Sequence, residues 1–305
     1  MPTLHPPSVS PPDTAEDDLR LGHLLGDDPA SPSAVLLGFP VDEGVVRNGG
    51  RPGAAGAPAR IRKQLYGMTP DARRGDAFRH LLRRTQDAGN LGDDASLAVR
   101  QAALGETLAP HLRRETVPII LGGGHETAYG HFIGYVEADT EVTILNWDAH
   151  PDVRPLIDEK PHSGSSFRQA LEHPSGHCQH YAVAGLQPHS TAAAHLQFIE
   201  EHDGHFAWAD ELSRSAVTER YESLSHPTMV TFDLDTVDQA QAPGVSAPAV
   251  NGLDQELWLH AAYHAGQCPQ VTSIDIVEMN PQVDVDDRTA RLAALTVMEV
   301  LRGLS

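Results

Sequence analysis

The chain has 305 residues, of which 40% are hydrophobic, and its formal net charge is −20 at neutral pH. This length and composition predict a globular fold with a sizeable core, and no run approaches the roughly 18 apolar residues of a membrane span. The negative charge disfavours nucleic acid, anionic membranes and acidic partners, because these bind to basic surfaces.

Residue usage also indicates the cellular location of the protein, the state of its cysteines and the salt concentration that suits it. The N-terminus lacks the charged start and apolar middle of a signal peptide, so we expect a cytoplasmic location. The two cysteines, Cys178 and Cys268, have no zinc-ligand spacing and are interpreted as reduced thiols. The acidic residues are spread along the chain, which suits high salt, because screening at about 1 M shortens the Debye length to roughly 3 Å. We therefore expect a halophilic source.

The predicted elements alternate between strands and helices. Residues 1–30, rich in Pro, Ser and Asp, predict a loose arm, and the uniform pattern of 31–305 predicts a single domain. The expected strands are 34–39, 117–121, 142–147, 181–186, 228–235 and 271–278. The expected helices include 76–86, 95–114, 190–202 and 254–266. This alternation predicts a three-layer α/β/α fold with a mostly parallel central sheet.

Polar clusters stand at the carboxyl ends of four of the expected strands. They are "GGGHE" (122–126), "DAHPD" (148–152), "DLDTVD" (233–238) and Glu278. Ligands of open parallel sheets bind outside the carboxyl ends of the strands, so one shared site is expected there. In an extended backbone, side chains two residues apart point the same way, so Asp148, His150 and Asp152 could face one point. The glycines would let the backbone at His125 turn sharply.

Each cluster also has a structural interpretation. Taken alone, "GGGHE" is most often a flexible turn, and it lacks the Lys-Ser/Thr of a phosphate loop. "DLDTVD" fails as a calcium loop, because Asp238 stands where glycine is required and Gly244 where glutamate is required. A solvated turn, however, has no reason to alternate Asp, His and Asp after six apolar residues. Four such clusters at four strand ends favour a functional site.

The residue types of these clusters indicate a metal. Carboxylates and imidazoles without a thiolate form a hard donor set that favours Mn or Mg, and the imidazoles favour Mn. There are more donors than one ion needs, so two ions about 3.5–4 Å apart, with a hydroxide between them, fit better. The candidate ligands are His125, Asp148, His150, Asp152, Asp233 and Asp235.

The clusters, in this order, resemble the three signature motifs of the ureohydrolases, the arginase and agmatinase family. Residues 38–62 resemble the family's N-terminal segment, and 273–281 its late strand. One departure is Gln239, which follows Asp238 where the family usually has proline. The resemblance implies an arginase-like fold and a homo-oligomer, either a trimer or a hexamer.

The resemblance also implies two Mn²⁺ per subunit and a role for each residue. Asp148 and Asp233 would bridge the ions, His125 and Asp152 would complete one ion, and His150 and Asp235 the other. His162 matches the family's proton-shuttling histidine, and Glu278 the carboxylate that holds the cationic head of the substrate. Asp235 could pass a proton to the departing nitrogen.

Three segments resemble the branch of the family that hydrolyses N-formimidoyl-L-glutamate to L-glutamate and formamide in histidine degradation. They are Glu126 in "GGGHE", "GVVRNGGR" (44–51) and "PHSGSSFRQ" (161–169). Such a substrate carries two carboxylates, and arginine grips a carboxylate with two parallel hydrogen bonds. The candidate substrate-binding residues are Arg47, Asn48, Arg51, Arg154 and Arg168.

Two alternatives stay open at this point. An agmatinase or another guanidino-compound hydrolase would share the metals and differ in the substrate tail. A non-catalytic, metal-stabilised subunit would use the fold for assembly. The presence of His162 and Glu278 disfavours the second alternative, because a structural role would tolerate their loss. Nickel or cobalt in place of manganese also stays open.

Overall fold

A mostly parallel sheet forms the centre of the protein. The computed structural model describes residues 2–15, 17–26, 32–92 and 95–305. Among these residues the strand order is β1-β3-β2-β4-β9-β8-β5-β6-β7, and neighbours pair in parallel except β1 with β3. The strands are β1 (Leu4–His5), β2 (Ala34–Phe39), β3 (Thr85–Leu91), β4 (Val117–Gly122), β5 (Val142–Trp147), β6 (Cys178–Leu186), β7 (His205–Trp208), β8 (Thr228–Asp233) and β9 (Val271–Val277).

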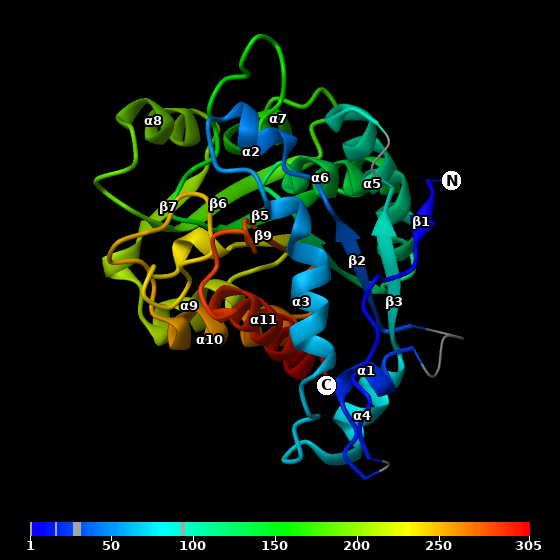
Figure 1. Cartoon of the computed structure of the whole chain (residues 1–305). Coiled ribbons are helices and arrows are strands. Elements are labelled where there is room, and N and C mark those ends of the chain that lie inside the picture. The colour runs from blue at the N-terminus through cyan, green and yellow to red at the C-terminus, as the bar shows by residue number, and fades with distance from the viewer. Residues whose placement is uncertain (1, 16, 27–31, 93–94) are drawn as a thin grey trace.

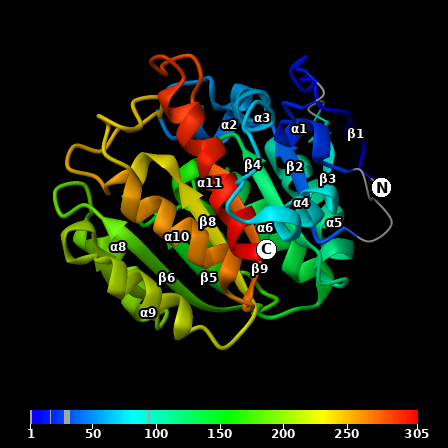
Figure 2. The same cartoon turned by 90° about the horizontal axis from the view of Figure 1, so that it is seen from below.

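Helices cover both faces of this sheet (Figures 1 and 2). They are α1 (Leu21–Leu24), α2 (Glu43–Arg47), α3 (Ala57–Tyr66), α4 (Gly75–Arg83), α5 (Leu97–Leu112), α6 (Thr127–Ala138), α7 (Ser166–Leu171), α8 (Ala193–Glu201), α9 (Arg214–Glu222), α10 (Gln255–Gln267) and α11 (Arg288–Leu304). Helices α3, α10 and α11 share one apolar core with the sheet, whereas α5 and α6 pack in separate clusters with other strand residues. Among the described residues, no helix has both the length and the apolar character that crossing a membrane requires.

The strand residues show why three layers form. In β4, Ile119 and Leu121 belong to the core under α3, α10 and α11, whereas Ile120 packs with α5. Alternate side chains of a strand point to opposite faces, so an apolar run such as "VPIIL" must be covered on both sides. The predicted α/β/α fold with a mostly parallel sheet is confirmed.

The prediction for 76–86 was wrong at its end. Helix α4 stops at Arg83, and Thr85 already begins β3. This strand is too polar for an apolar pattern to indicate it, and it is stabilised instead by buried charge. The guanidinium of Arg62 donates to both carboxylate oxygens of Asp87, at 2.8 and 2.9 Å, and Arg62 is fully buried.

The segment predicted as a loose arm contacts the domain at two places. Leu4 and His5 pair with β3, and Leu21 and Leu24 are buried in the core that contains α3. The boundary predicted between residues 30 and 31 lies outside the described residues, so the division into an arm and one catalytic domain stays a prediction.

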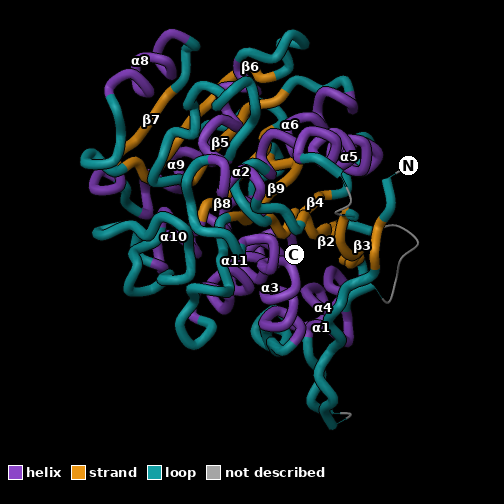
Figure 3. The backbone as a smooth tube through the Cα atoms, turned by 45° about the horizontal axis from the view of Figure 1, so that its top comes forward, coloured by secondary structure: helices purple, strands orange, loops and turns teal. Residues whose placement is uncertain are grey.

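The strand order brings the predicted clusters together. Strands β4, β9, β8 and β5 are consecutive neighbours in the sheet, and all four are parallel. Their carboxyl ends therefore lie side by side at one edge. The tube in Figure 3 shows the loops that gather there, and α2 and α7 lie above the same edge in Figure 1.

Candidate metal centre

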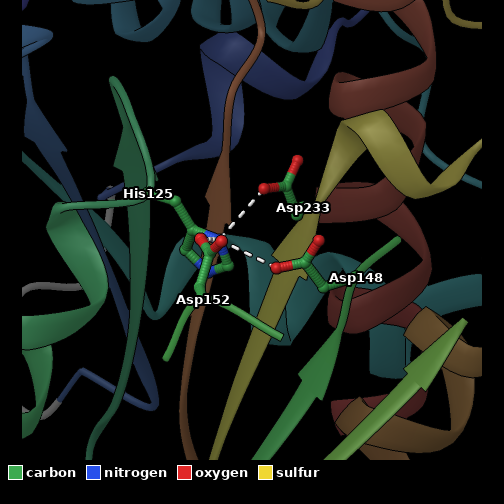
Figure 4. A group of neighbouring side chains, drawn as sticks. All are labelled: His125, Asp148, Asp152 and Asp233. Carbon is green, nitrogen blue, oxygen red and sulfur yellow. Dashed lines mark ion pairs between the residues drawn. The ribbon is translucent and has the colours of Figure 1, made fainter. Parts of the chain in front are cut away.

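Two overlapping groups of side chains converge at this edge. One contains His125, Asp148, Asp152 and Asp233, and the other contains Asp148, His150 and Asp235. Within each group, one donor atom per residue lies within 4.8 Å of the others. In Figure 4 the carboxylates of the first group surround the His125 ring, whose Nδ1 lies 3.2, 3.0 and 3.0 Å from oxygens of Asp148, Asp152 and Asp233. Asp148 belongs to both groups.

Turns aim these side chains, and the predicted strand geometry was wrong. Strand β5 already ends at Trp147, and the His150 N–H then donates to Asp148 Oδ1 at 2.7 Å. Likewise, the Asp235 N–H donates to Asp233 Oδ1 at 2.9 Å. Aspartate makes such turns by bonding the backbone two residues on. Alternate side chains therefore converge because each aspartate closes a turn, not because a pleated strand continues.

The glycine triplet allows close packing of the backbone and does not supply a positive φ angle. None of Gly122, Gly123 and Gly124 has a positive φ in the described chain. A Cβ atom on Gly123 would lie 1.7 Å from the Val41 carbonyl oxygen, so the loop after β4 packs directly against the segment before α2. The chain does bend at Gly123 and Gly124 and turn at His125, as predicted, but the close packing against Val41 is what requires glycine at position 123.

Glu126 also holds these two segments together. It is fully buried, and its Oε1 accepts a hydrogen bond of 2.7 Å from the Gly44 N–H. Burial raises the pKa of its carboxyl to about 7. The residue that resembles the formimidoyl-glutamate branch therefore supports α2 and does not line the pocket described below.

Dense packing makes the negative charges of the centre costly. Burial, together with repulsion by Asp235 and Asp148, raises the pKa of Asp233 well above its ordinary value. Burial also raises the pKa of Asp235 to about 6. Burial acts in the same direction on Asp148, but hydrogen bonds with His125 and His150 outweigh it and lower the pKa. A bound cation would relieve this repulsion.

Unpartnered atoms show where a cation fits. His125 Nδ1 and Asp235 Oδ1 are both buried and have no hydrogen-bond partner among the described residues. Each belongs to one of the two groups, and a buried polar atom without a partner costs free energy. Carboxylate oxygens and imidazole nitrogens are donors that Mn²⁺ accepts. The residues present therefore fit a metal centre.

A pocket of about 250 Å³ opens onto these groups. The acidic part of its lining comes from Asp152, Asp233, Asp235 and Glu278, beside His150. The rest of the lining is Val45, Asn48, Gly49, Gly50, Arg154, Ser163, Ser246 and Ala247. Sequence reasoning missed Ser163 and Ser246, and only the resemblance of 161–169 could have indicated the first of them.

Only Arg154, of the four predicted arginines, lines this pocket. Its guanidinium donates to Asn48 Oδ1 at 3.2 Å, and Asn48 Nδ2 donates to Ser163 Oγ at 3.1 Å. Two of the predicted substrate-binding residues, Arg154 and Asn48, therefore lie together at the pocket, on the loops after β5 and α2.

The other three arginines are occupied within the protein. Arg47 pairs with Glu43 and donates to the Pro161 carbonyl, and Arg51 donates to the carbonyls of Val245 and Ser246. Arg168 donates to the Val153 carbonyl at 2.8 Å and lies 3.7 Å over the Phe198 ring. In the part of the chain that the structure describes, none of these three is among the residues lining the pocket.

The two other predicted catalytic residues differ in placement. Glu278 lines the pocket, and its Oε1 accepts a hydrogen bond of 2.8 Å from the His125 N–H. His162 is buried, its Nε2 lies 3.0 Å from the Pro155 carbonyl oxygen, and it is absent from the described lining. A proton-shuttling role for His162 stays a prediction.

The departure at Gln239 has a local explanation. Asp238 belongs to neither group of the described residues and instead accepts hydrogen bonds from the Ala240 and Asn251 N–H groups, at 2.8 and 2.9 Å. The Gln239 N–H donates to the Ala249 carbonyl at 2.9 Å. Proline has no N–H to donate, so glutamine adds a bond to this turn without touching the metal centre.

The sheet and the converging donors define an α/β protein with a candidate two-metal centre at the carboxyl edge. Its sequence matches the model of the arginase family over residues 32–302, and the chain belongs to that family. The predicted ureohydrolase membership is thereby confirmed, and with it the prediction of a metal-dependent hydrolase.

Individual relatives resemble the chain over most of its length. A formimidoylglutamase of Rhodococcus jostii is 38% identical over 292 residues, covering 90% of this chain and 87% of the relative. One of Geobacillus thermodenitrificans is 35% identical over 296 residues, covering 93% and 88%. A crystal structure of Trypanosoma cruzi formiminoglutamase with Mn²⁺ has a TM-score of 0.86 and 31% identity, covering 94% of this chain and 99% of that one.

Proposed function

We propose that the protein hydrolyses N-formimidoyl-L-glutamate to L-glutamate and formamide. The observation that carries this proposal is the pocket, which has acidic side chains at one part of its lining and Arg154 at another. The acidic part suits a cationic formimidoyl head, and the guanidinium suits a carboxylate of the glutamate tail. The names of the relatives in Rhodococcus and Geobacillus support the same substrate.

We further propose that each subunit holds two Mn²⁺. One ion would be held by His125, Asp148, Asp152 and Asp233, and the other by His150 and Asp235 together with Asp148 and Asp233 as bridges. Such ions, when bound, lower the pKa of a water molecule so that a hydroxide is available near neutral pH. The unpartnered Nδ1 of His125 and Oδ1 of Asp235 support this arrangement.

The side chains of the pocket would orient the substrate and move its protons. Glu278 would hold the cationic head, and Arg154 with Asn48 and Ser163 would hold the tail. Oxygen from water adds to the formimidoyl carbon, and the bond from this carbon to the glutamate nitrogen breaks. Asp235 would pass a proton to that nitrogen, which leaves as the amine of glutamate, and His162 would exchange protons with solvent.

A substrate panel tests the proposed activity. The Mn²⁺-loaded protein is assayed in high salt with N-formimidoyl-glutamate, agmatine, arginine and guanidinobutyrate, and kcat/KM is measured for each. We expect the highest value for N-formimidoyl-glutamate. A preference for agmatine or another guanidino compound would replace this assignment by the alternative of a guanidino-compound hydrolase. Inactivity on all four would favour the non-catalytic subunit.

We also propose that the surface is adapted to high salt. The chain has 42 acidic against 22 basic residues, so its folded form carries strong self-repulsion that ions screen. The thermal unfolding midpoint should therefore rise between low and molar KCl. A neutral osmolyte at equal osmolality is the control, since it does not screen charge. A midpoint that falls steadily with KCl contradicts the halophilic interpretation.

Assembly and location stay predictions. The homo-oligomer, expected as a trimer or hexamer, can be tested by light scattering coupled to size exclusion in high salt. The cytoplasmic location can be tested by fractionating cells of the source organism.

A further inference from the structure

A buried hydroxyl contacts the ring of His125 on the side away from the metal centre. Its Nδ1 faces the carboxylates of the metal centre, and its Nε2 lies 2.9 Å from Thr231 Oγ1. Thr231 lies on β8, two residues before Asp233, and is fully buried. Its hydroxyl donates to Asp275 Oδ1 at 2.5 Å.

Asp275 connects this hydroxyl to a second buried histidine. It lies in the middle of β9, where a carboxylate is costly unless it is paired, and it is fully buried. Its Oδ2 lies 2.7 Å from Nδ1 of His131, a fully buried residue of α6. His131 Nε2 in turn lies 2.5 Å from Ser273 Oγ, which is 2.5 Å from the Tyr135 hydroxyl.

These contacts permit one assignment of protons that suits metal binding. An imidazole that binds a metal through Nδ1 must carry its proton on Nε2. His125 Nε2–H then donates to Thr231, the Thr231 hydroxyl donates to Asp275, and His131 Nδ1–H donates to the other oxygen of Asp275. Every member is satisfied, and the carboxylate at the centre only accepts.

The second histidine of the metal centre has no such support. The side chain of His150 is 23% exposed, and its Nε2 makes no hydrogen bond with any residue that the structure describes. Outer partners of a metal-binding histidine fix its tautomer and ring orientation, and their loss typically weakens metal binding 10- to 100-fold. The two ion positions therefore differ in what holds their imidazole.

We propose that Thr231, Asp275 and His131 are positioning residues that set the affinity of one ion only, the ion at His125. This inference rests on the proposed ligand role of His125. Through Thr231, the buried Asp275–His131 pair keeps Nδ1 turned toward the carboxylates. Asp275 and His131 lie outside the pocket lining of the described chain, and they reach His125 through the hydroxyl of Thr231.

Stepwise Mn²⁺ binding to the metal-free protein tests the proposal. Calorimetric titration gives an affinity for each ion, and the step that His125→Ala abolishes is the one at His125. We expect Thr231→Val and Asp275→Asn to weaken that step about 10- to 100-fold and to leave the other unchanged. Thr231→Ser, which keeps the hydroxyl, should restore it, and His131→Gln should give a smaller loss.

Tyr135→Phe is the matched control at the far end of the chain of contacts, and it should leave both steps unchanged. Circular dichroism and thermal midpoints identify variants that fail to fold. If Asp275→Asn does not fold, the comparison of Mn²⁺ affinity between Thr231→Val and Thr231→Ser tests the proposal instead. Wild-type affinities in folded Thr231→Val, or equal losses in both steps, overturn the proposal.

The titration contains no substrate, so its result is independent of the substrate panel. Equal losses of affinity in both binding steps refute the positioning role but do not contradict the proposed substrate. Failure of the wild type to bind two ions refutes the proposed metal centre and this inference together. A different preferred substrate in the panel leaves the inference intact.

Discussion

Asp148→Ala is expected to lower kcat/KM for N-formimidoyl-glutamate by on the order of a thousandfold or more. Asp148 is fully buried and is the only residue, within the described chain, that belongs to both candidate groups, so its loss weakens both ion positions. Metal-ion catalysis contributes several kcal/mol of transition-state stabilisation, and each 1.4 kcal/mol is about tenfold in rate. Asp233→Ala should be of similar severity, because it is the other proposed bridge.

Elemental analysis distinguishes this cause from simple unfolding. The wild type should contain bound transition metal, whereas Asp148→Ala should be depleted in it while keeping its circular dichroism spectrum. Asp238→Asn is the matched control, since Asp238 is in the same motif as Asp233 but belongs to a turn. A wild type that is active without bound transition metal would refute the proposed centre.

Arg154→Ala is expected to raise KM for N-formimidoyl-glutamate roughly tenfold to a hundredfold, with a smaller fall in kcat. A charge-assisted hydrogen bond contributes about 1.5–3 kcal/mol, and this contact lies far from the reacting carbon, so it affects binding more than chemistry. Arg154→Lys keeps the charge but not the planar guanidinium, so its KM should lie between those of the wild type and Arg154→Ala. Steady-state kinetics measures each value.

Arg168→Ala is the matched control for this prediction. Arg168 lies on a neighbouring segment, but its guanidinium is occupied by the Val153 carbonyl, Glu172 and the Phe198 ring. Its variant should keep the wild-type KM. An unchanged KM in Arg154→Ala would contradict the proposed tail contact, and an increase in Arg47→Ala or Arg51→Ala would move that contact to α2 or to the loop that follows it.

The sequence predicts the strands of the sheet that are apolar, and it does not predict a strand that is held by charged side chains. Strands such as β2 and β4 are apolar on both faces, so their runs stand out. Strand β3 does not, because its partly buried Asp87 is held by Arg62, a partner 25 positions away, and by the hydroxyl of Tyr66. A pairing of that kind cannot be recognised from local composition.

The candidate site, too, could be predicted from the sequence only in part. The donors could be named because they follow apolar strands directly, although turns and not pleats aim them. The arginines could not be separated, because all four lie near the motifs and only the folded loops decide which one faces the pocket. Asp275 carried a signal that sequence reasoning did not use, since an acid inside an apolar strand requires a buried partner.

The contact between the glycine loop and α2 has a consequence for protein engineering. Gly123 leaves no room between the loop and Val41, and Glu126 holds Gly44 by its N–H. The loop that follows α2 provides Asn48, Gly49 and Gly50 to the lining of the pocket, while the loop after β4 carries His125. Grafting a foreign 44–51 segment to change substrate preference would therefore disturb metal loading, unless Gly44 and its spacing from Glu126 are retained.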